Sequence, residues 1–175
     1  TAALQLVAKE ILHISDIVKD AVSNTIEIVK TEDISQLEGL LEKGKNIKAL
    51  TEKTTEYLAL LFSSGTMTEQ QAAQTASLMY ILSDVERMGS LSVEIAKCIQ
   101  EKEQNNYKYT PEAMDELQKS LRTLEKMFID SMKALQGDKS VQIDKMVKRK
   151  DKIMDLDIKM RKAHLQRVNK GKCKA

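Results

Sequence analysis

Two clusters of polar residues could support chemistry, and the first lies in the middle of the chain. Asp84 and Glu86 flank the apolar Val85, and Gly89 follows them closely. Carboxylates beside a glycine are candidates for holding a cation, because a glycine lets another group approach a helix closely. Pairing with Arg87 or a nearby lysine is the simpler interpretation of the same charges.

The second cluster lies near the C-terminus, where Arg161, His164 and Arg167 recur at three-residue intervals. On a helix this spacing places the three side chains along one polar and cationic stripe. Such a stripe could bind an anion or a partner's carboxylate. The structural alternative is that it ties the end of the helix to a neighbouring bundle.

Further carboxylates recur at helical spacing in the pairs Asp16/Asp20 and Asp151/Asp155. An i, i+4 pair shares one helix face and could in principle share a cation. Asp151 and Asp155 point away from the apolar stripe that contains Ile153, so we interpret these pairs as solvated charge.

Histidine and cysteine form no recognisable ligand set or nucleophile site. His13 and His164 lack partners at zinc-ligand spacing, and Cys98 and Cys173 belong to no CxxC pattern. The sequence also shows no glycine-rich phosphate loop. We therefore predict no catalytic residue, no metal site, no cofactor and no enzymatic activity, in a protein from a reducing compartment.

The composition indicates which elements must position these residues. The 175 residues are 42% hydrophobic but only 3% aromatic, with one proline and six glycines. This palette favours helices over strands, and the length suits a single domain. The longest apolar run, Leu58 to Phe62, is far too short to span a bilayer. We expect one all-α domain over residues 1–175, built of long antiparallel helices, and we interpret the chain as part of a longer protein.

Apolar periodicity and end signals predict five helices. The first covers residues 3–30, and Thr31-Glu32-Asp33 is interpreted as the start of the second, which ends at Ser63-Ser64-Gly65. Thr68 and Gln71 form a capping-box pattern for the third, which is expected to fray over 101–106. Thr110-Pro111 should start the fourth, which runs to Gly137, and Asp138 the fifth, which ends near Gly171.

An internal repeat relates these helices. An offset of 106 residues places Ile11 on Leu117, Leu40 on Met146 and the terminating Gly65 on Gly171. Residues 1–106 are therefore predicted to form a first three-helix repeat, and residues 107–175 a second repeat that lacks its third helix.

Three stretches carry a resemblance to a known family. Asp84-Val85-Glu86-Arg87-Met88-Gly89, with Ile95-Ala96, is similar to the third-helix pattern of PhoU domains. The spacing of Arg161, His164, Arg167, Gly171 and Cys173 resembles the end of the fifth helix in PhoU domains at the cytoplasmic C-terminus of bacterial sodium/phosphate cotransporters. Residues 46–58 resemble the second helix.

The resemblance implies a pair of three-helix bundles that regulates phosphate uptake and homeostasis rather than catalysing a reaction. It also implies an upstream transmembrane transporter domain and a location on the cytoplasmic side of the membrane. The alternatives are a free-standing PhoU-type metal-binding regulator and a generic helical scaffold.

Several relatives of this type bind metal clusters through paired carboxylates four residues apart, and here the pattern departs. Ser90 stands where a partner for Glu86 is needed. The positions where paired carboxylates would be expected hold Gly44 and Lys48 in the second helix, and Lys150 and Met154 in the fifth. The departures predict that no such cluster is bound.

The charge is unevenly distributed. Residues 145–175 hold twelve Lys/Arg and three Asp, a surplus of nine, so a net charge of +2 leaves −7 for residues 1–144. The basic segment is expected either to attract an anionic membrane surface or to pair with the acidic remainder. Nucleic acid is not expected as a partner, because aromatic stacking platforms and helix-turn-helix spacing are missing.

A missing sixth helix would leave Val147, Ile153 and Leu156 uncovered in the second repeat. An open apolar groove favours association. We expect a homodimer or a partner helix through this repeat, with a monomer whose third helix is rearranged as the alternative.

Overall fold

The computed structural model describes residues 2–106 and 108–135, together with residues 162, 165, 169 and 170. Four helices cover most of this part: α1 (Ala2–Thr31), α2 (Leu37–Ser63), α3 (Glu69–Gln104) and α4 (Pro111–Leu135). These described residues contain no strand, so the all-α prediction is confirmed. Apart from residues 162, 165, 169 and 170, the fifth helix expected over 138–171 lies outside the described residues.

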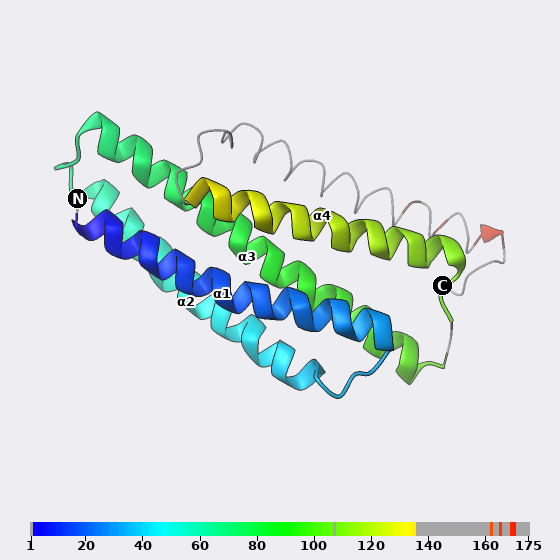
Figure 1. The fold of residues 1–175 in the computed structure, drawn as a ribbon. Coiled ribbons are helices and arrows are strands. Elements are labelled where there is room, and N and C mark those ends of the chain that lie inside the picture. The colour runs from blue at the N-terminus through cyan, green and yellow to red at the C-terminus, as the bar shows by residue number, and fades with distance from the viewer. Residues whose placement is uncertain (1, 107, 136–161, 163–164, 166–168, 171–175) are drawn as a thin grey trace.

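Helices α1, α2 and α3 form a three-helix bundle in which each helix contacts the other two (Figure 1). Its core is aliphatic, because the apolar residues of each helix recur at helical spacing. Ile11, Ile14 and Val18 of α1 are completely buried, as are Leu40 of α2 and Val85 of α3. The bundle forms within the predicted first repeat, while the repeat itself stays a prediction.

Two glycines bring α2 and α3 close together. A Cβ built on Gly44 of α2 would lie 2.9 Å from Cγ2 of Val93, and one on Gly89 of α3 would lie 3.2 Å from two side-chain atoms of Ile47. Helix α2 continues without a break through Gly44. This residue therefore serves close packing and does not interrupt the helix.

The C-terminal end of α2 and the starts of α3 and α4 follow the predicted signals. Gly65 adopts a φ of +66° just after α2, a conformation that favours glycine. Thr68 and Gln71 form a complete capping box at the start of α3. The amide of Ala113 donates to Oγ1 of Thr110 at 3.2 Å, which caps α4.

The predicted start of α2 is wrong. Thr31 is the last residue of α1 and its hydroxyl donates to the Glu27 carbonyl at 2.8 Å. Oδ1 of Asp33 accepts the Ser35 amide at 2.9 Å, so this side chain closes a turn in the loop. Helix α2 begins only at Leu37, after Gln36, which makes no side-chain cap.

Helix α4 packs on α3 and α1 and makes no contact with α2. Its buried apolar side chains, which recur every three or four residues, are Leu117, Leu121, Leu124 and Met127. Among the described helices, α4 therefore covers one side of the bundle and leaves the outer face between α1 and α2 uncovered (Figure 1).

Candidate functional site

The central polar cluster lies on α3, with its members at different depths. Val85 is fully buried, as its position between the two carboxylates predicts. Asp84 is also buried, at 7% exposure, whereas Glu86 and Arg87 are partly exposed and Ser90 is exposed. Asp84 thus belongs to the packed interior, whereas Glu86, Arg87 and Ser90 are accessible to a ligand or partner.

Gly89 provides the close approach that the sequence predicts for this cluster. The groups that approach it are the side chains of Ile47 from α2 and Val18 from α1, the latter 3.7 Å from the position of a Cβ. The space beside Gly89 is therefore filled by the core of the bundle.

Neither Glu86 nor Arg87 forms an ion pair with another residue that the structure describes. The two ion pairs formed between described residues join Lys102 to Glu32 and Lys119 to Asp115. The predicted role of Asp84 and Glu86 in pairing with Arg87 or a nearby lysine stays a prediction.

The described residues at the positions where a metal cluster would need paired carboxylates, Gly44, Lys48 and Ser90, do not suit metal binding. The nearest heavy atom to a Cβ at Gly44 is a Val93 methyl at 2.9 Å, so an acidic side chain there would displace the packing of α3. Lys48 and Ser90 are exposed and supply no carboxylate. Across the described residues, no group of three or more His, Cys, Asp or Glu could hold a metal ion.

The remaining candidates divide between an exposed face of α1 and positions outside the described residues. Asp16, Asp20 and His13 are exposed on α1. The cationic stripe of Arg161, His164 and Arg167 lies outside the described residues. The other C-terminal candidates also lie outside them: Asp151, Asp155, Lys150, Met154 and Cys173.

A groove that the sequence analysis did not identify runs between α1 and α2. Its volume is about 280 Å³ and most of its surface is apolar. We call it the α1–α2 groove, and its lining residues are Leu6, Val7, Glu10, Leu50, Lys53, Thr54 and Tyr57. The feature of the sequence that could have indicated this groove is that Leu6 and Tyr57 are large apolar residues at the edge of the core stripes of their helices.

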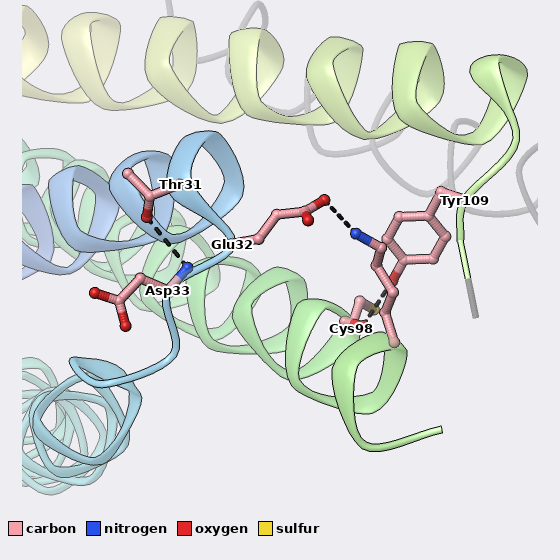
Figure 2. A network of polar contacts seen from close by, with 6 residues as sticks. Thr31, Glu32, Asp33, Cys98 and Tyr109 are labelled. Atoms are coloured by element: carbon pink, nitrogen blue, oxygen red, sulfur yellow. Dashed lines mark hydrogen bonds and ion pairs between the residues drawn. The ribbon is translucent and has the colours of Figure 1, made fainter. Parts of the chain in front are cut away.

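At the opposite end of α1, a polar network joins the α1–α2 loop to the end of α3 (Figure 2). Lys102 pairs with Glu32, and its Nζ lies 5.7 Å from the centroid of the Tyr109 ring. The Tyr109 hydroxyl donates to the Cys98 carbonyl at 2.6 Å. The network therefore fixes the connection that leads into α4.

Cys98 of this network has an exposed surface and a free thiol. Burial of the thiol against its neighbours raises its pKa, and the nearby carboxylates of Glu101 and Glu94 raise it further. A raised pKa keeps the sulfur protonated at neutral pH, which is unfavourable for a nucleophile. We therefore interpret this network as one that holds the loop, α3 and the start of α4 together, and not as a nucleophile site.

None of the helices that the structure describes is long and apolar enough to cross a membrane.

Comparison with protein families gives one match. The family model of the PhoU domain matches residues 11–99, which extend from the first third of α1 to the last turns of α3. Searches of curated proteins and of solved structures gave no significant match.

Proposed function

This chain belongs to the PhoU domain family, and we propose that it is the cytoplasmic regulatory domain of a sodium-dependent phosphate transporter. Family membership associates the chain with the regulation of phosphate homeostasis and with a regulatory, non-enzymatic role. The transporter context is the finer part of the proposal.

One sequence observation supports that context. The spacing of Arg161, His164, Arg167, Gly171 and Cys173 resembles the ending found in the transporter-linked branch of the family. It lies beyond residues 11–99, so it is independent of the family match.

The proposed mechanism uses helix contacts. A packed three-helix core of aliphatic residues is a rigid body, and a rigid body can favour one state of a partner by binding it more tightly. The partner would be the transmembrane transporter domain. Attraction of the basic residues 145–175 to an anionic inner leaflet would hold the domain near that partner.

The test compares the full-length gene product with a version from which residues 1–175 are deleted. Each is produced in cells without other phosphate carriers, and labelled phosphate uptake is measured with and without sodium, at scarce and abundant phosphate. We expect sodium-dependent uptake from both proteins. Only the intact protein should reduce its uptake capacity as phosphate becomes abundant.

Two results would contradict the proposal in different ways. Absence of sodium-dependent uptake from the full-length protein would refute the transporter context and favour the free-standing regulator. Sodium-dependent uptake with the same phosphate response in both proteins would refute the regulatory role.

A further inference from the structure

The α1–α2 groove lies on the face that α4 leaves uncovered. Two of its lining residues are large apolar side chains with much of their surface in water, Leu6 at 62% and Tyr57 at 42% exposure. Leu60 lies three residues after Tyr57, on the same side of α2, and is 68% exposed. Single exposed leucines are ordinary, but two large exposed side chains in one groove, with a third one helical turn further along α2, indicate a contact surface.

The charges at this groove have opposite signs on opposite walls. Glu10 is the acidic lining residue and belongs to α1, and Lys53 is the basic one and belongs to α2. Glu10 is partly exposed and Lys53 is exposed, so both can reach a partner. A partner seated on the groove must therefore present a base over α1 and an acid over α2.

We propose that a second copy of this chain docks on the α1–α2 groove, related to the first by a two-fold axis parallel to the groove. This rotation places α1 of each copy over α2 of the other. Glu10 then faces the second copy's Lys53, and the symmetric pair forms on the other side of the axis. Leu6 faces the second copy's Tyr57 in the same way.

The resulting contact is a four-helix bundle. Because α1 and α2 are antiparallel in one copy, each helix also runs antiparallel to the helix that it faces across the interface (Figure 1). An unrelated helix would satisfy one base and one acid by chance, whereas the two-fold copy satisfies all four groove charges with residues already present. The charge pattern therefore favours a second copy.

The helix lengths suit a stable contact. With 27 residues, α2 is the shorter of the two helices, and at about 1.5 Å per residue it spans roughly 40 Å. Two adjacent helices about 10 Å wide present a face on the order of 800 Å² per copy, which matches a standard protein–protein interface. This surface differs from the residue 107–175 region on which the sequence placed a homodimer.

The first experiment measures molar mass by sedimentation equilibrium over micromolar concentrations of the 175-residue chain. We expect a dimer whose dissociation constant rises by about tenfold or more for Leu6→Asp, because a buried charge would face Tyr57. Ile129→Asp is the matched control, since Ile129 is 46% exposed but lies on α4. It should leave the dimer unchanged.

Two outcomes of this experiment would overturn the proposal. One is a wild-type chain that remains a 19.8 kDa monomer throughout. The other is a dimer that Ile129→Asp dissociates and Leu6→Asp does not, which would place the interface on α4.

The second experiment reverses the groove charges and separates this arrangement from other dimers. Glu10→Lys and Lys53→Glu should each weaken self-association, because every facing pair becomes like-charged. An equimolar mixture of the two variants should form heterodimers, since each lysine then faces a glutamate. Asp16→Lys, an exposed reversal on α1 outside the groove lining, is the control.

Circular dichroism checks that each variant is folded before its association is measured. Association of both single variants at wild-type strength would overturn the proposed pairing. A mixture that associates no more tightly than its components would overturn it as well.

Discussion

Gly44 shows at the residue scale how a position that lacks an expected ligand can serve packing instead, and Gly89 takes part in the same packing. The resemblance to relatives that bind metal through paired carboxylates predicts an acidic residue near Ile47. Here Gly44 stands at that position and makes room for Val93. The side chain of Ile47 in turn occupies the space beside Gly89. The absence of a side chain at both positions lets α2 and α3 approach closely.

Two glycines of α2 give a matched test of this interpretation. Gly39→Ala should raise the free energy of unfolding by about 0.5–1 kcal/mol, since no atom lies within 4 Å of the new Cβ and alanine favours the helix. Gly44→Ala should lower it by up to about 2 kcal/mol, because the stiff Val93 side chain must move. Urea unfolding of both variants measures the difference. Equal stabilisation by both would show that the close contact carries no strain.

Two exposed aspartates should titrate below their usual value of 3.8, each for a different reason. Hydrogen bonds from Ser35, the backbone one first, lower the pKa of Asp33. A hydrogen bond from Lys119 and its charge lower the pKa of Asp115. A lowered folded-state pKa stabilises the fold above the unfolded-state value, and this contribution is lost as the pH falls through the folded-state pKa.

Carbon-detected NMR titration measures both pKa values in one sample. Lys119→Ala should raise the pKa of Asp115 toward 3.8 and leave that of Asp33 unchanged. A shift of both residues would indicate a general change in the charge of the molecule. No shift of Asp115 would rule out Lys119 as the cause.

Sequence reasoning located the central polar residues but not their depth. Asp84 directly precedes a core residue, which suggested an accessible candidate beside the apolar stripe. Because α3 contacts α1, α2 and α4, its buried face is wider than one stripe and includes Asp84. The number of neighbours of a helix is a tertiary property, so periodicity alone could not predict this burial.

At the scale of elements, end signals succeeded where a side chain bonds its own helix. The Thr68 capping box was predicted from Gln71 three residues on, and the Thr110 cap from Pro111 at the first helical position; both side chains bond within the first turn of their own helix. The start of α2 predicted at Thr31 and Asp33 was wrong because the Thr31 side chain bonds the preceding helix and the Asp33 side chain bonds the loop. The same residue types can end one helix or start the next, and local sequence did not distinguish these cases.

The Thr68 cap gives a prediction at this scale. Thr68→Ala removes the acceptor of the Gln71 amide and should cost about 1 kcal/mol of stability, whereas Thr68→Asp should keep most of it. Denaturant unfolding measures both variants. A cost from Thr68→Asp as large as that from Thr68→Ala would indicate that the hydroxyl acts in another way.

The α1–α2 groove could not be predicted from single helices. Leu6 and Tyr57 are ordinary apolar residues until α1 and α2 are placed side by side and α4 is known to cover another face. This information depends on which helices pair in space. The functional surface proposed for the molecule therefore emerged only from the fold.

For the molecule as a whole, the residues at the family's cluster positions predict that no multinuclear metal cluster is bound. Elemental analysis of protein purified without chelator should find less than stoichiometric iron and zinc after dialysis. Gly44→Asp with Lys48→Asp restores a carboxylate pair in α2 and serves as a comparison. Stoichiometric metal in the wild-type chain would contradict the prediction.

The uneven charge of the chain predicts salt-sensitive binding to anionic membranes. The chain should sediment with phosphatidylglycerol vesicles at low salt and be released at about 0.5 M salt, where charges are screened beyond roughly 4 Å. Reversal of Lys148 and Lys152 should weaken binding more than reversal of Lys19 and Lys30 in α1. Equal effects, or binding unaffected by salt, would exclude a specific role of residues 145–175.

The order of the helices along the chain also has a consequence for the speed of folding. Helices α1, α2 and α3 follow one another through the short connections 32–36 and 64–68, and each packs on the next. Contacts between neighbours in sequence require little loop-closure entropy before they contribute to stability. Helical proteins dominated by such local contacts fold within roughly microseconds to milliseconds. The three-helix core can thus form early during synthesis, before residues beyond α3 are available to join it.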